Sequence, residues 1–181
     1  MNTDEKILAL CQEGGKETEA FNFIVDEYSE RLYWHIRRMI GSHEDTNDIL
    51  QETFIKIWKN ISKFRGDSKV YSWLYRIATN EALNFLRKKK LESFLSLDNY
   101  EGIVEENLKG DSYFDGDKAV EALNNAVLKL PPKQRAVFNL KYFEEKKYTE
   151  ISEILGGSIG SLKASYHHAY TKITKSLTDT D

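Results

Sequence analysis

The side chains best suited to chemistry in this sequence are four histidines, His35, His43, His167 and His168. Successive residues on a helix point about 100° apart, so His167 and His168 cannot bind one metal ion without unwinding the helix. The sequence has no His-x-x-x-His pair, no nucleophile–base motif and no glycine-rich phosphate loop. We therefore predict a protein that is not an enzyme, with no catalytic residues, no metal site and no cofactor.

A polar stripe on one predicted helix offers binding groups instead. Its members follow one another at spacings of four, four and three residues, opposite an apolar face that begins at Val70: Arg76, Asn80, Asn84 and Arg87. Aromatic residues interleaved with cations suit single-stranded DNA, because an unstacked base gains about 1–3 kcal/mol on an aromatic ring. The aromatic residues near this stripe are Phe64, Tyr71, Trp73 and Tyr75.

A purely structural interpretation competes for several of these residues. Trp73 falls on the apolar side of the helix, and Tyr71 and Tyr75 fit either role. The cations from Arg87 to Lys90 either stabilise the negative end of the helix dipole or contact phosphates, and we favour phosphate contact.

The last 35 residues predict a helix-turn-helix. Thr149 can cap a short helix, Gly156 and Gly157 supply a tight turn, and Ser158 can cap a longer amphipathic helix. The second helix of such a motif enters the major groove of duplex DNA by its N-terminal half. Its outward positions here are Gly160, Ser161, Lys163, Ala164, His167 and His168. The alternative is a plain helical hairpin.

These segments sit in a chain that we expect to be all-α, with two small helical domains. Apolar residues at three- and four-residue steps predict three helices between residues 21 and 86, the middle one with Trp58 on its core face. Periodicity weakens from residue 93 to residue 116, and helices resume at Val120, with a start at Pro132. The expected boundaries are 1–92 for the first domain, 93–116 for an acidic flexible linker and 117–181 for the second domain.

The distribution of charge supports two modules that face nucleic acid. Residues 56–90 carry ten cations and two anions, a net charge of +8, and residues 122–178 carry nine and four, a net charge of +5. Acidic stretches precede and separate them, so the overall charge is only −3. Two solvated charged faces are the alternative. No secretion signal or membrane-length apolar run is visible, and the single Cys11 fits a reducing compartment, so we expect a cytoplasmic protein without membrane insertion.

Taken together, these segments resemble the extracytoplasmic-function (ECF) sigma factors of bacterial RNA polymerase over nearly the whole chain. The run from Asp48 to Phe54 is similar to that family's clamp-docking helix, and residues 64–68 with 72–80 are similar to its promoter-melting loop and helix. Residues 130–138 and 148–169 resemble its C-terminal domain. Two such matches in order, separated by an acidic linker, are far more specific than a lone helix-turn-helix.

The resemblance implies three contact surfaces and three partners. Core polymerase would be bound by Asp48, Gln51, Glu52, Phe54 and Lys56. The −10 element of promoter DNA would be opened and held, with a base flipped from the non-template strand, by Phe64, Arg65, Asp67, Ser68, Tyr71, Trp73, Arg76, Asn80, Asn84, Arg87 and Lys88. The −35 duplex would be read by Ser158, Gly160, Ser161, Lys163, Ala164, His167 and His168. The acidic linker would run toward the RNA exit path, and an anti-sigma factor is expected as the third partner.

Departures from the family pattern occur in the helix-turn-helix. Ser165 and His168 replace two arginines, Ser152 replaces a usual alanine, and Gly157 stands where an apolar residue is common. Fewer cations predict weaker or altered −35 contacts. The alternatives to a sigma factor are a stand-alone helix-turn-helix regulator of duplex DNA, which needs neither the Asp48 helix nor the Phe64 loop, and, less favoured, an enzyme.

Overall fold

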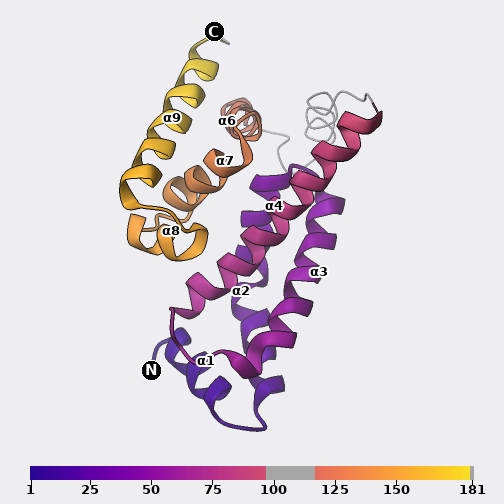
Figure 1. Ribbon diagram of the computed structural model, residues 1–181, viewed down its shortest axis with the longest axis vertical. Coiled ribbons are helices and arrows are strands. Elements are labelled where there is room, and N and C mark those ends of the chain that lie inside the picture. Colours follow the sequence, from indigo (N-terminus) through magenta and orange to yellow (C-terminus); the bar gives the residue numbers. More distant parts are fainter. Residues whose placement is uncertain (97–116, 180–181) are drawn as a thin grey trace.

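The computed structural model describes residues 1–96 and 117–179, and all regular secondary structure in these ranges is helical (Figure 1). The all-α prediction is therefore confirmed. The predicted linker lies outside the described residues from position 97 onward. Residues 93–96, which the sequence pattern assigned to that linker, instead form the end of a helix.

The first half of the chain forms an N-terminal bundle of four helices: α1 (Thr3–Gln12), α2 (Glu17–Ile40), α3 (His43–Asn60) and α4 (Val70–Ser96), with the 3-10 turn η1 (Ile61–Lys63) after α3. Helices α2, α3 and α4 lie side by side (Figure 1). A glycine and a serine form the turn between α2 and α3. Gly41 ends α2 with φ 86°, and the Ser42 hydroxyl accepts a hydrogen bond from the Asp45 amide at 3.2 Å.

Helix α1 is present in addition to the three helices that the sequence predicted for this bundle. Its start is fixed by a reciprocal cap, in which the Asn2 side chain accepts from the Glu5 amide at 2.8 Å and the Glu5 carboxylate accepts from the Asn2 amide at 2.9 Å. Its buried face, Ile7, Leu10 and Cys11, joins the main core, where burial raises the pKa of the Cys11 thiol to about 11. The Asn-x-x-Glu spacing in the sequence was the signal that could have revealed this helix.

The second half forms a C-terminal bundle: α6 (Lys118–Leu128), α7 (Pro132–Phe138), the π-helical turn η3 (Asn139–Phe143), α8 (Tyr148–Leu155) and α9 (Ile159–Thr178). Pro132 starts α7 as expected. Gly156 and Gly157 both have positive φ, 75° and 85°, in the turn between α8 and α9. Lys147, not Thr149, occupies the N-cap position of α8, so that prediction was wrong.

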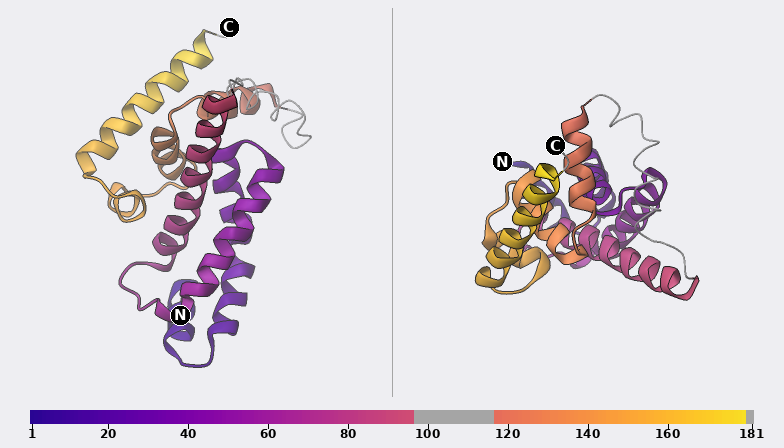
Figure 2. Two further views of the ribbon diagram at one scale, coloured as in Figure 1. Left: turned by 45° about the vertical axis from the view of Figure 1, so that its right-hand side comes forward. Right: turned by 90° about the horizontal axis from the view of Figure 1, so that it is seen from above.

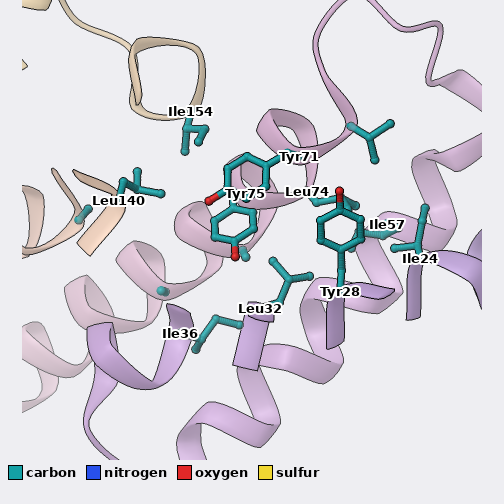
Figure 3. Close-up of a cluster of buried hydrophobic side chains, with 14 of the residues drawn as sticks. Ile24, Tyr28, Leu32, Ile36, Ile57, Tyr71, Leu74, Tyr75, Leu140 and Ile154 are labelled. Atoms are coloured by element: carbon teal, nitrogen blue, oxygen red, sulfur yellow. The ribbon is translucent and has the colours of Figure 1, made fainter. Parts of the chain in front are cut away.

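The two bundles share an apolar core. Figure 3 shows Leu140 and Ile154 of the C-terminal bundle beside Tyr71 and Tyr75 of α4. Helix α8 packs against α4, and α9 lies on the outer side of the C-terminal bundle (Figure 2). The free chain therefore holds its two bundles in contact, an arrangement that periodicity alone does not predict.

A buried arginine joins the bundles at the other end of this interface. Arg135 of α7 donates from Nη2 to the carbonyl oxygens of Leu128 and Leu130 at 2.5 and 2.9 Å. Its Nη1 donates to the carbonyl oxygen of Met39, near the end of α2. One side chain thus satisfies backbone acceptors from both halves of the protein.

His35 predicts how stability depends on pH. It is fully buried on α2, 2.8 Å from the Thr79 hydroxyl, and burial, with a smaller effect of Arg38, lowers its pKa to about 3. The unfolded chain takes up this proton below pH 6.5, so stability is lost as the pH falls from 6.5 toward 3. We expect a loss of about 1.4 kcal/mol between pH 7.5 and 5.5 from this residue, measured by urea unfolding. The same slope in His35→Gln would contradict the assignment.

Candidate polymerase and nucleic-acid interfaces

The outer face of α3 presents the predicted polymerase-binding residues. Asp48, Gln51, Glu52 and Lys56 are exposed, whereas Phe54 is half-buried and packs edge-on against Phe21 of α2 at 6.1 Å between ring centroids. Four of the five predicted side chains can therefore contact a partner directly. Phe54 instead helps to fix α3 on α2.

Two apolar residues on this helix are exposed although the sequence pattern did not single them out as a surface. Ile55 is 40% exposed and Trp58 is 45% exposed, so the placement of Trp58 in the core was wrong. The Trp58 ring packs edge-on against the Phe21 ring, with 5.3 Å between the ring centroids. This contact holds the indole in place at the surface. Exposed aromatic and aliphatic groups ringed by polar residues are typical of protein-docking surfaces.

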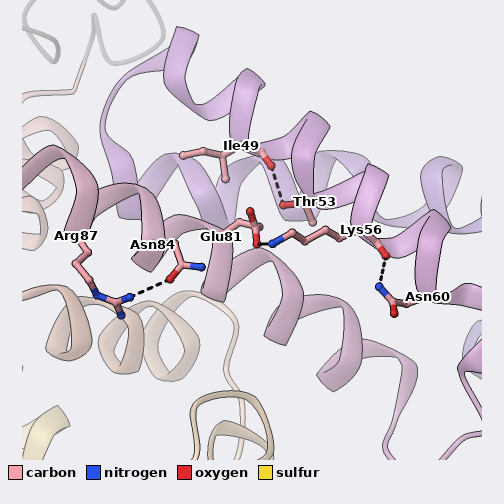
Figure 4. A network of polar contacts seen from close by, with 7 residues as sticks. All are labelled: Ile49, Thr53, Lys56, Asn60, Glu81, Asn84 and Arg87. Atoms are coloured by element: carbon pink, nitrogen blue, oxygen red, sulfur yellow. Dashed lines mark hydrogen bonds and ion pairs between the residues drawn. The ribbon is translucent and has the colours of Figure 1, made fainter.

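A groove between α3 and α4 contains the two asparagines of the polar stripe. It has a volume of about 410 Å³ and is lined by Lys56, Asn60, Ile77, Asn80, Glu81 and Asn84. Figure 4 shows Lys56 reaching from α3 to an ion pair with Glu81 of α4, and Arg87 donating to the side-chain oxygen Oδ1 of Asn84 at 3.2 Å. Lys56, predicted to bind polymerase, thus lies beside residues predicted to bind DNA.

The predicted melting loop is anchored to the bundle. Phe64 is 8% exposed and stacks on Trp73, with 4.5 Å between centroids and 21° between planes. The Gln12 side chain of α1 donates to the Arg65 carbonyl at 3.3 Å. Asp67 and the Arg65 side chain remain exposed, and Ser68 is half-buried. Helix α4 begins at Val70, after this loop. The loop offers polar groups at its tip and keeps its aromatic ring packed.

Other predicted strand-binding residues are covered by the C-terminal bundle. Tyr71 is 5% exposed and its hydroxyl donates to Glu144 at 3.3 Å, while half-buried Arg76 donates from Nε to the Glu153 carbonyl at 2.9 Å. Tyr75 donates to the same Glu144 carboxylate at 3.0 Å. Burial raises the pKa of both tyrosines above the usual range, with Glu144 and the neighbouring tyrosine adding to the effect at Tyr71, so both hydroxyls remain donors.

The far end of the stripe is open. Asn80, Asn84, Arg87 and Lys88 are all exposed on one long helix. The predicted −10 residues therefore fall into an accessible set and a covered set. Phe64 and Trp73 pack on each other within the N-terminal bundle, whereas Tyr71 and Arg76 are covered by the C-terminal bundle.

The helix-turn-helix forms as predicted, and all seven of its predicted contact residues are exposed: Ser158, Gly160, Ser161, Lys163, Ala164, His167 and His168. The Ser158 hydroxyl accepts from the Ser161 amide at 3.1 Å, which confirms the cap. The unusual Ser152 donates to the carbonyl of Gly157 at 2.7 Å, so two departures from the family pattern brace one turn.

Other kinds of site are not evident in residues 1–96 and 117–179. No three His, Cys, Asp or Glu side chains gather there in a group able to hold a metal ion. None of the helices in these ranges combines the length and apolar character needed to cross a bilayer.

Comparison with known proteins identifies the two bundles. The Sigma-70 region 2 model matches residues 24–92, and the Sigma-70 region 4 model matches residues 120–173. The ECF RNA polymerase sigma factor SigW of Bacillus subtilis is 34% identical over 171 residues, covering 90% of this chain and 91% of that protein. The ECF RNA polymerase sigma-E factor of Haemophilus influenzae is 30% identical over 183 residues, covering 97% and 95%.

Solved structures agree on the fold. CnrH, in complex with the cytosolic domain of CnrY, aligns with a TM-score of 0.69 at 20% identity and covers 99% of both chains. The sigma factor RpoE of Bartonella quintana, in complex with the anti-sigma factor NepR, aligns with a TM-score of 0.71 at 21% identity, covering 87% of this chain and 96% of that one. The two matched regions and the relatives agree with the sequence resemblance: this chain belongs to the ECF sigma factors of RNA polymerase.

Proposed function

We propose that this sigma factor divides its work among three surfaces: α3 for core polymerase, the α3–α4 groove with the stripe on α4 for the −10 strand, and α9 for the −35 duplex. The observation that carries the proposal is the exposure of Asn80 and Asn84 beside a groove, on a chain whose separate helix-turn-helix is also exposed. One surface suits an unstacked base and the other suits intact duplex.

The α3 face supports polymerase docking through mixed chemistry. Asp48, Gln51 and Glu52 supply polar contacts, and exposed Trp58 supplies an aromatic anchor of the kind that carries much of the energy at protein interfaces. Lys56 is better placed to serve the groove, because Glu81 holds its amine between α3 and α4.

The groove supports capture of a flipped base. Asn80 and Asn84 present amide groups able to pair with base edges, and Arg87 orients the Asn84 amide. Lys56, Arg87 and Lys88 place cations around the groove for the adjacent phosphates.

The −35 surface carries few cations, and this sets a measurable salt dependence. Lys163 is exposed near the start of α9, whereas Lys175 lies near its end. For binding of the holoenzyme to −35 duplex, we plot the logarithm of the affinity against the logarithm of the salt concentration. We expect Lys163→Ala to make the slope of this plot shallower by about one, because one phosphate contact is lost. Lys175→Ala is the matched control and leaves the slope unchanged. Equal slopes in all three proteins would remove Lys163 from the interface.

The family supports a binding role without catalysis, and we propose the same for this chain. We also propose that the protein acts in the cytoplasm, as its sequence leads us to expect. We also propose an anti-sigma protein as a regulatory partner, since the structural neighbour from Bartonella quintana is described in complex with one. The alternative, a stand-alone regulator of duplex DNA, is not favoured by the two matched sigma regions, and it leaves the exposed α3 face and the groove unused.

The deciding experiment is transcription in vitro with core polymerase and a genomic DNA library. The proposal expects defined start sites that depend on the added protein, together with a stable complex between the protein and core polymerase. Tight binding to duplex DNA with no polymerase complex and no start sites would favour the stand-alone regulator instead.

A further inference from the structure

Helix α9 carries cationic and titratable side chains but no acidic ones. From Ile159 to Thr178 it contains three lysines, two adjacent histidines and no aspartate, glutamate or arginine. Lys163 is the one lysine in the half of this helix that would enter the groove of a duplex. His167 and His168 follow one turn later and are both exposed. Further positive charge near the middle of α9 therefore depends on whether these two histidines are protonated.

The two imidazoles lie on the outer side of α9. Leu162, Ala169 and Ile173 are buried and face the rest of the C-terminal bundle. Because successive residues on a helix point about 100° apart, His167 and His168 flank the exposed line opposite this buried face, one on each side of it. Their ring centroids are 6.2 Å apart, with 57° between the ring planes. A duplex that lies against α9 would meet both rings.

The position of the pair along α9 suits phosphates better than base edges. His167 follows Ile159 by eight residues, which is roughly 12 Å along the helix axis at 1.5 Å per residue. Base edges are contacted by residues at the start of a recognition helix, and the major groove is only about 12 Å wide. Side chains this far along the helix therefore approach the phosphates that border the groove.

The groups that flank the pair on α9 are cations with contacts of their own. Lys163, one turn before, has its amine 5.8 Å from the centre of the Tyr148 ring at the start of α8. Lys172, one turn after, donates to the Gln134 side chain of α7 at 3.1 Å. Within the described residues, neither imidazole has a hydrogen bond or an ion pair. The protonation of the pair is therefore not fixed by an acidic partner.

The helices that pack against α9 also leave the pair without a carboxylate. On α8, Glu150 pairs with Lys69 of α4 at 3.1 Å, and the carbonyl of Glu153 accepts a hydrogen bond from α4, so these residues lie at the contact with the N-terminal bundle. Helix α7 has one lysine, one arginine and no acidic residue. Helix α6 meets α9 through apolar residues and carries Lys118 and Glu121 in its first turn. A DNA phosphate would be the first anionic partner of either imidazole.

We propose that His167 and His168 bind phosphates of the −35 duplex in their protonated form, so that the affinity for the −35 element rises as the pH falls from 8 to 6. This inference rests on the proposed role of α9 at the −35 duplex. Histidine is the side chain that ordinarily changes its charge in this range, and a phosphate close to it favours the protonated form. Binding of the duplex therefore takes up protons, and each protonated imidazole adds one phosphate contact.

The test measures binding of the holoenzyme to a fluorescein-labelled duplex that carries the −35 segment of a start site mapped with the parent protein. Fluorescence anisotropy gives the affinity at pH 6 and at pH 8, each over a series of salt concentrations. The double variant His167→Gln/His168→Gln keeps two polar side chains and removes both titrating groups. His43→Gln, at an exposed position on α3, is the matched control. The remaining histidine, His35, is buried with its pKa lowered to about 3, so it stays neutral throughout.

We expect the parent protein and His43→Gln to bind about ten-fold more tightly at pH 6 than at pH 8. The plot of log affinity against log salt concentration should also be steeper at pH 6, by about one to two. The double variant should match the parent at pH 8 and lose most of the gain at pH 6. His168→Arg should bind more tightly than the parent at pH 8 and depend less on pH, because its charge is permanent.

The inference is overturned if the double variant, with the parent's circular dichroism, keeps the parent's dependence on pH. It is also overturned if that variant loses the same affinity at both pH values, since the histidines would then act without protonation. Lys163→Ala, measured at pH 8, tests the −35 role of α9 separately. Weaker binding in Lys163→Ala with unaltered pH dependence in the double variant would keep the −35 surface and reject the protonation. Unchanged binding in all of these variants would reject α9 as the −35 surface.

Discussion

Replacing Arg135 with Met lowers the stability of the protein by about 3–5 kcal/mol, the largest effect that we expect from a single substitution. The methionine retains an apolar stem but donates no hydrogen bonds. The carbonyls of Leu128, Leu130 and Met39 then lose a charged donor inside the protein, and an unsatisfied buried acceptor costs about 1–3 kcal/mol. The site cannot admit water freely, because Arg135 is 4% exposed.

Thermal unfolding followed by circular dichroism checks this result, with a midpoint expected to fall by about 10 °C. Lys133→Met is the matched control, since Lys133 is an exposed cation two residues earlier on the same helix. Its midpoint should stay within about 2 °C of the parent. Equal midpoints for the two variants would show that the backbone acceptors around Arg135 find other donors.

Replacing Asn80 and Asn84 together with Ala reduces open-complex formation by about 100-fold. Each amide that pairs with a base edge contributes about 1–3 kcal/mol, so losing two contacts corresponds to roughly 3 kcal/mol. Both side chains are exposed on α4, so the helix itself should form normally. Permanganate reactivity of unpaired thymines in the −10 region measures the effect.

A binding assay with core polymerase distinguishes this loss of melting from misfolding. The α3 face is unchanged in the double variant, so it should bind core polymerase as the parent protein does. Asn22→Ala, at an exposed position on α2, is the control for removal of a surface amide. Unchanged melting in the double variant would refute base capture by these residues. Loss of core binding would show instead that this part of α4 contributes to docking.

Sequence periodicity was sufficient for the helices whose apolar faces are long and whose ends carry specific caps. Pro132 and Ser158 both begin helices where the sequence predicts, and α9 follows its apolar repeat. Short α1 was missed because only three of its ten residues are buried, too few for a repeat to stand out. The family resemblance was visible because its motifs depend on local spacing.

The environment of single side chains was less predictable. Trp58 has the spacing of a core residue, yet it lies at the edge of the α2–α3 contact with one side exposed. Tyr71 and Tyr75 were ambiguous because their burial depends on helices more than sixty residues later in the chain. Glu144 was not singled out, since a lone acidic residue after an amphipathic helix has no local sign of its long-range partners.

Helix α4 runs unbroken from Val70 to Ser96, which at 1.5 Å per residue is a rod of roughly 40 Å. Asn80 and Lys90 are therefore held roughly 15 Å apart by backbone hydrogen bonds rather than by a loop. One inserted residue between them would turn the downstream cations by about 100° away from the asparagines. In the proposed role of α4, the footprint on a strand would therefore have a fixed length set by helix geometry. Side-chain replacement would change which bases it favours and leave that length unaltered.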